Sequence, residues 1–113
     1  MSNLMSEYIE AEKLKDDGKL DDAIAKLQEV LAVDGSFVIA HSALAVLYGK
    51  VNQHELAIEH AKQVCELEPN DAFSFTALSV TYQRAYAGTD NHAYIQMAED
   101  AMAQSQHVQQ LAI

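Results

Sequence analysis

Proline, glycine, tryptophan and cysteine are all scarce in this chain of 113 residues, which holds one proline, four glycines, no tryptophan and one cysteine. So few helix breakers, beside plentiful alanine, leucine, glutamate and glutamine, favour an all-α fold. The single cysteine, Cys65, cannot form an internal disulfide, which is typical of a reducing compartment, so we expect a cytoplasmic protein. The length predicts one compact domain.

Basic side chains are also few, because 7 Lys and Arg stand against 17 Asp and Glu, a formal net charge of −10. Such an acidic surface repels phosphate backbones and anionic lipids, which argues against nucleic-acid and membrane partners. The longest mostly apolar run, residues 37–48, has 12 residues, whereas a membrane-spanning helix needs about 18 or more. The N-terminal segment lacks the apolar core of a secretory signal.

Turn-forming residues divide the chain into six segments, each about as long as a helix of three to four turns. A shift of 34 residues aligns the first third with the second and the second with the last, which indicates an internal repeat. The dividing residues are Gly18, Gly35, Asn52, Pro69 to Asp71 and Gly88 to Asn91. The matched pairs include Gly18 with Asn52, Ala23 with Ala57, Ile24 with Ile58, Val30 with Val64, Leu44 with Leu78, Val46 with Val80 and Tyr48 with Tyr82.

This 34-residue period, with small residues at fixed places, resembles the tetratricopeptide repeat (TPR) family. The middle unit carries the family pattern best, through Leu44, Ala45, Tyr48, Ala57, Ala61, Val64 and Pro69. The resemblance implies one domain, residues 1–113, in which three helix–turn–helix units (about 4–37, 38–71 and 72–108) stack as a short right-handed α–α superhelix. In the third unit we expect a longer turn, Ala87 to Asn91, with two or three inserted residues, and a poorly capped last segment.

The sequence contains no constellation of residues that predicts an enzyme, a cofactor or a metal site. It lacks a glycine-rich phosphate loop, a GxSxG elbow and a CxxC pair. His54 and His60 are six residues apart and point about 120° apart on a helix, so we expect both to be solvated or partly packed. Cys65 matches the apolar Leu31 and is expected to be buried. His41 replaces a family aromatic and is expected to be a core or half-buried histidine rather than a general base.

The resemblance places the functional surface in a concave groove lined by the first helix of each unit. Ile39, Val46, Phe73 and Val80 are apolar but lie outside the family's packing positions, so they predict a site for an apolar or amphipathic peptide or protein segment. The alternative is that neighbouring helices cover them. The expected groove residues are Met5, Tyr8, Glu12, Lys15, Ile39, Ser42, Val46, Lys50, Phe73, Thr76, Val80 and Arg84.

A second interpretation is a homo-oligomeric scaffold that self-associates, as in a homodimer, through the groove or the last helix. That helix carries only two charges, and its candidate interface residues are Met97, Met102, Val108 and Leu111.

One known use of the family is the capture of acidic chaperone tails by a clamp of Lys, Asn and Arg. The matching positions here hold Tyr8, Glu12, Ala43, Phe73 and Ala77. Since none of these supplies the clamp and Glu12 repels a carboxylate, the sequence argues against this use.

Overall fold

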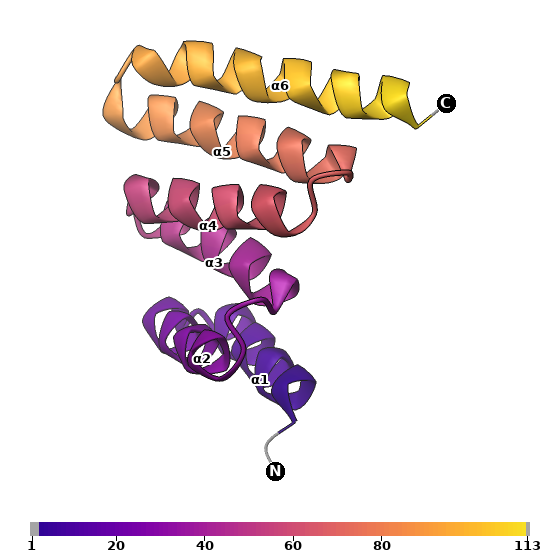
Figure 1. The fold of residues 1–113 in the computed structure, drawn as a ribbon. Helices are drawn as coiled ribbons and strands as arrows, with labels where there is room; N and C mark the ends of the chain where they lie inside the picture. Colours follow the sequence, from indigo (N-terminus) through magenta and orange to yellow (C-terminus); the bar gives the residue numbers. More distant parts are fainter. Residues whose placement is uncertain (1–2, 113) are drawn as a thin grey trace.

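The computed structural model describes residues 3–112, which form six α-helices and no strand. Helices that are neighbours in sequence pack against each other in an ascending stack, and α3 also contacts α5 directly (Figure 1). The all-α repeat architecture expected from the sequence is therefore confirmed. The helices are α1 (Leu4–Asp16), α2 (Leu20–Val33), α3 (Val38–Lys50), α4 (His54–Leu67), α5 (Ala72–Thr89) and α6 (Ala93–Leu111).

The turns inside the first two units have the same backbone geometry. The matched residues Gly18 and Asn52 both have positive φ angles, 80° and 64°. The next residue donates its N–H to an equivalent carbonyl in each case, Lys19 to Leu14 and Gln53 to Tyr48, both at 2.8 Å. Glycine and asparagine adopt this left-handed conformation at low cost, which explains why the first unit has glycine and the second has asparagine at this position.

Two helices begin with a side-chain cap. Asn3 Oδ1 accepts the N–H of Met5 at 3.0 Å, and Asp71 Oδ1 accepts the N–H of Phe73 at 3.0 Å. Asn3 Oδ1 also accepts the N–H of Ser6 at 3.4 Å. These caps satisfy amides that a helix leaves free at its N-terminus and so fix where α1 and α5 begin.

The core consists of two apolar clusters, one on each side of the middle unit. Alanines at Ala45, Ala57 and Ala61 are all buried and allow the helices to approach closely, as the repeat pattern predicts. The first cluster joins α1, α2 and α3 through Ala11, Ala23, Leu27, Val30, Ala40, Leu44 and Leu47. The second joins α3, α4, α5 and α6 through Ala45, Ile58, Ala61, Cys65, Leu78, Tyr82, Ala85, Ala98 and Ala101.

The expectation of a longer turn in the third unit is wrong. Helix α5 continues through Gly88 and Thr89, and α5 and α6 have 18 and 19 residues, against 13 and 14 in the first two units. Thr89 Oγ1 donates to the carbonyl of Ala85 at 2.7 Å, and Asp90, with φ 59°, ends the helix. The inserted residues thus lengthen both helices instead of the turn.

Gly88 is required by packing, since a Cβ at this position would overlap the buried imidazole of His54 on α4. We expect Gly88→Ala to lower the free energy of unfolding by about 1–3 kcal/mol despite the better helix propensity of alanine. Gly49, also helical, has open space at its Cβ position, so Gly49→Ala is the matched control and should be neutral or stabilising by up to about 1 kcal/mol. Urea denaturation of both variants measures the difference, and equal stabilisation by the two would contradict this account.

Candidate functional site

Two hollows run along the side of the stack formed by α1, α3 and α5. Ser42 and Val46 line both, so the hollows adjoin, and together we call them the groove. The first, about 260 Å³ between α1 and α3, is lined by Tyr8, Glu12, Lys15, Ile39, Ser42, Ala43 and Val46. The second, about 290 Å³ between α3 and α5 with two residues of α4, is lined by Ser42, Ala45, Val46, Ala61, Val64, Ser74, Ala77, Val80, Thr81 and Arg84.

Most of the residues expected at the groove line one of the two hollows, but four do not. Met5, Lys50 and Phe73 are exposed and line neither hollow. The expectation for Thr76 is wrong, because its hydroxyl shares a 2.8 Å hydrogen bond with that of Ser105 on α6 and so faces the other side of α5.

The apolar character of the groove is carried by Ile39 and Val46 on α3. Their side chains are 39% and 40% exposed, so the neighbouring helices among residues 3–112 do not cover them, whereas Val80 is half-buried. The repeat pattern predicts only a packing role for Ala45 and Ala61. Their small side chains also leave the space that forms the second hollow.

Among the described residues, the groove has a paired charge at its α1 end and an unpaired positive charge at its α5 end. Lys15 Nζ lies 2.9 Å from Glu12 Oε2, and this hydrogen bond raises the pKa of Lys15. Burial, followed by the nearby Glu12 charge, raises the pKa of Tyr8, so its phenol stays protonated at neutral pH. Arg84 at the α5 end forms no ion pair with the residues that the structure describes. This end therefore offers a positive charge to a ligand.

Two histidines form a pair outside the groove. His41 Nε2 donates to the carbonyl of Gly35 at 2.8 Å, which leaves His41 Nδ1 to accept from His60 Nδ1 at 2.9 Å. The ring of Tyr48 stacks on that of His60 with centroids 5.6 Å apart. His41 is buried and His60 is half-buried, both as expected, whereas His54 is buried more fully than the solvated or partly packed ring that the sequence predicts.

Burial, and then the neighbouring His41, lower the pKa of His60, although Glu59 acts in the opposite direction. The unfolded chain then binds a proton at a higher pH than the folded one, so stability is full above pH about 6.5 and falls as the pH drops toward the lowered pKa. Thermal melts between about pH 7 and pH 5 should show His60→Gln losing less stability than the wild type. The exposed His107 provides the control His107→Gln, which should follow the wild type. Parallel losses in all three proteins would refute this assignment.

Cys65 is buried, as the sequence predicts. Its Sγ donates to the carbonyl of Ser74 at 3.3 Å, and burial raises the pKa of the thiol to about 11. The thiol is therefore protonated at neutral pH and is a poor nucleophile. Within residues 3–112 no three His, Cys, Asp or Glu side chains come close enough together to hold a metal ion.

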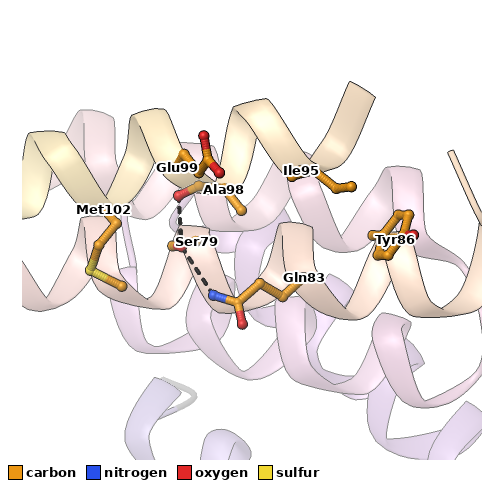
Figure 2. A pocket seen from close by; sticks show the side chains of 7 residues that line it. All are labelled: Ser79, Gln83, Tyr86, Ile95, Ala98, Glu99 and Met102. Carbon is orange, nitrogen blue, oxygen red and sulfur yellow. Dashed lines mark hydrogen bonds between the residues drawn. The ribbon is translucent and has the colours of Figure 1, made fainter. Parts of the chain in front are cut away.

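The last helix carries a third hollow, about 440 Å³ between α5 and α6 (Figure 2). Of the residues expected at a self-association surface, Met97 and Leu111 are exposed and Met102 is half-buried and lines this hollow. Val108 is buried inside the chain, so the expectation for this residue is wrong. The hollow is lined by Ser79, Gln83, Tyr86, Ile95, Ala98, Glu99 and Met102.

Across residues 3–112, none of the helices combines the length and the apolar character that crossing a bilayer requires.

No family model and no curated protein sequence matches the chain. Solved structures do: a crystal structure of MamA has a TM-score of 0.79 at 17% identity, over 97% of this chain and 60% of that one. MamA 41-end from Desulfovibrio magneticus RS-1 has a TM-score of 0.72 at 20% identity, over 94% and 56%. This chain therefore spans little more than half the length of these MamA structures.

A third similar structure is the first TPR of Spaghetti (RPAP3) bound to the HSP90 peptide SRMEEVD. It has a TM-score of 0.64 at 15% identity, over 97% of this chain and 94% of that one. Together with the six-helix stack, these similarities confirm the resemblance noted in the sequence: the chain is a TPR-like helical repeat protein.

Proposed function

We propose that this chain is a non-catalytic protein-interaction module whose groove binds a peptide segment with apolar anchors. The observation that carries the proposal is the exposure of Ile39, which lines the first hollow, and of Val46, which lines both. Exposed apolar side chains that line a hollow gain free energy when a ligand removes them from water. Two adjoining hollows suit two apolar anchors in one extended segment.

The charge of the chain favours a neutral or basic ligand. The net charge is −10, and Glu12 lies on the α1 wall of the groove. Opposite charge on the ligand speeds encounter and suppresses wrong partners. Arg84 adds a cation at the α5 end, which suits a single carboxylate or carbonyl there rather than an acidic peptide.

Two other functions have less support. Catalysis would need a reactive group in the groove, but Cys65 is buried as a thiol and the His41–His60 pair lies outside it. Self-association would bring together two copies that each carry a net charge of −10. A reducing compartment such as the cytoplasm fits the buried, free Cys65.

The acidic peptide SRMEEVD, which the similar RPAP3 domain binds, should not bind here. Tyr8, Ala43, Phe73 and Ala77 provide no cation for its carboxylates, and Glu12 repels them. Isothermal titration should give a dissociation constant weaker than about 1 mM. Micromolar binding would show that Lys15 and Arg84 suffice as a clamp and would remove the preference for a basic ligand.

The proposal is tested with a fluorescein-labelled peptide, Lys-Leu-Ser-Gly-Ser-Leu-Lys, which is too short to form a stable helix. We expect saturable binding by fluorescence anisotropy with only weak salt dependence, because apolar burial dominates. The matched control peptide has serine in place of both leucines and should not bind. Equal binding of the two peptides would mean that charge alone attracts them and would overturn the proposal.

A further inference from the structure

The hollow between α5 and α6 is lined by residues of these two helices (Figure 2), and Ile95 among them is 40% exposed. Figure 2 shows Ile95 and Met102 on α6 with Ala98 between them. Ser79 Oγ donates to the carbonyl of Ala98 at 2.7 Å and so links α5 to α6 beneath the hollow. The surface is mostly apolar, with Glu99 as its acidic side chain.

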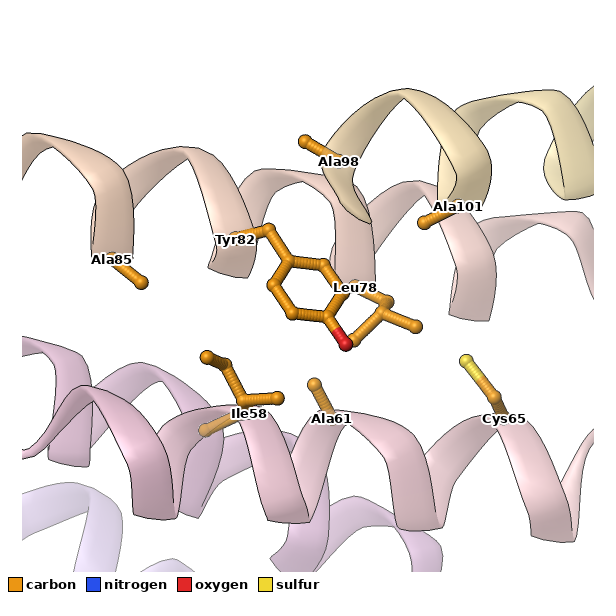
Figure 3. Packing of buried hydrophobic residues seen from close by; sticks show 9 residues of the cluster. Ile58, Ala61, Cys65, Leu78, Tyr82, Ala85, Ala98 and Ala101 are labelled. Atoms are coloured by element: carbon orange, nitrogen blue, oxygen red, sulfur yellow. The ribbon is translucent and has the colours of Figure 1, made fainter. Parts of the chain in front are cut away.

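The same face of the preceding unit is covered by a helix. Ile58, Ala61 and Cys65 of α4 stand 37 residues before Ile95, Ala98 and Met102, the repeat period plus three inserted residues. Figure 3 shows these three α4 residues opposite Leu78, Tyr82 and Ala85 of α5. As a result Ile58 is 8% exposed, whereas Ile95 is 40% exposed. The third unit thus exposes an apolar helix face equivalent to the one that α5 covers on the second unit.

We propose that this end face binds an amphipathic α-helix of a partner protein, seated on α5 and α6 as α5 is seated on α3 and α4. The chemistry of the occupant follows from α5 itself. It needs apolar side chains at the spacing of Phe75, Leu78, Tyr82 and Ala85, with a small residue at the closest approach. It also needs Lys or Arg to face Glu99, because a helix that buried this carboxylate unpaired would lose affinity.

A second copy of the chain is a poorer occupant. The helix that would continue the stack is α1, and where α3 and α5 carry Leu44 and Leu78 it carries Glu10, which pairs with Lys26 at 3.0 Å. Docking α1 would set the Glu10 carboxylate at the position where Leu78 of α5 makes apolar contacts, which costs free energy. Any pairing of two copies would also bring together chains that each carry a net charge of −10.

The end face is separate from the groove. Its residues Ser79 and Gln83 and the groove residues Val80 and Arg84 lie on different sides of α5, and the two surfaces share no lining residue. One ligand in the groove and one helix on the end face are therefore compatible, so the chain would link two partners.

The probe is a labelled peptide with the sequence of residues 72–89, carrying Phe73→Lys, Ala77→Lys and Ala87→Lys at positions that are exposed in α5. We expect it to bind the whole chain in fluorescence anisotropy. Ile95→Glu should weaken binding at least about tenfold, and Glu99→Lys should weaken it by repelling the positively charged probe without altering an apolar contact.

The controls separate this proposal from the one for the groove. Met97 is also 40% exposed on α6 but, two residues from Ile95, points to another side of the helix, so Met97→Glu should change affinity less than about twofold. Val46→Glu in the groove should also leave the affinity for the probe unchanged. No binding to the wild type, loss with Val46→Glu alone, or a homodimer by light scattering that Ile95→Glu dissociates would each overturn the proposal.

Discussion

Replacing Val46 with glutamate weakens binding of the two-leucine peptide at least about tenfold, which is about 1.4 kcal/mol of binding free energy. Val46 lines both hollows, so no anchor of the peptide avoids the new carboxylate. Burying that charge without a partner costs free energy, and the substitution also removes an apolar contact. Fluorescence anisotropy at constant salt measures the change.

Leu56 on α4 is the matched control. It is 37% exposed, close to the 40% of Val46, and lines neither hollow of the groove. Leu56→Glu introduces the same charge into the same protein, so a general electrostatic effect on a lysine-bearing peptide would appear equally in both variants. Equal affinities of the Val46 and Leu56 variants would show that the groove is not the binding site.

Truncating Leu44 to alanine lowers the free energy of unfolding by about 2–5 kcal/mol. Leu44 is fully buried in the cluster that joins α3 to α1 and α2. A repeat stack is held together by the interfaces between neighbouring units, so this loss acts on the junction between the first and second units. A domain of this size is stable by only about 5–15 kcal/mol.

Urea denaturation followed by circular dichroism measures this loss. The exposed Val33 on α2 supplies the control, since Val33→Ala should change stability by less than about 0.5 kcal/mol. A Leu44→Ala variant that loses less than about 1 kcal/mol would mean that the first unit contributes little to the stack.

The repeat could be predicted from the sequence because its signals are local. Gly18 and Asn52 mark turns through their backbone conformation, and Ala45, Ala57 and Ala61 mark close helix contacts through their size. These properties belong to single residue types at fixed spacing and need no knowledge of distant contacts.

The third unit could not be predicted in the same way. Gly88 indicates a turn when read locally, yet in α5 it is the residue that makes room for His54, which lies 34 positions earlier. Glycine in a helix costs about 1 kcal/mol, and tertiary packing overrides that preference here. The repeat register predicts Thr76 in the groove, but its hydroxyl is hydrogen-bonded to that of Ser105 on the longer α6.

The candidate sites could also be predicted only in part. The α3 side of the groove could be predicted because Ile39 and Val46 are apolar although they lie outside the core positions of the repeat. The end face was missed except for Met102, although a signal existed: Ile95 repeats Ile58 once three residues are inserted. The His41–His60 contact depends on how α3 crosses α4, which a sequence pattern does not specify.

The most direct test of the groove is methyl NMR of the whole chain during titration with the two-leucine peptide. Binding in the groove predicts saturable shifts of the Ile39, Val46 and Val80 methyl resonances, with those of Leu56 and Ile95 unchanged. Shifts confined to Ile95 and Met102, or no shifts at saturating peptide, would contradict the claim that the groove is the peptide-binding surface.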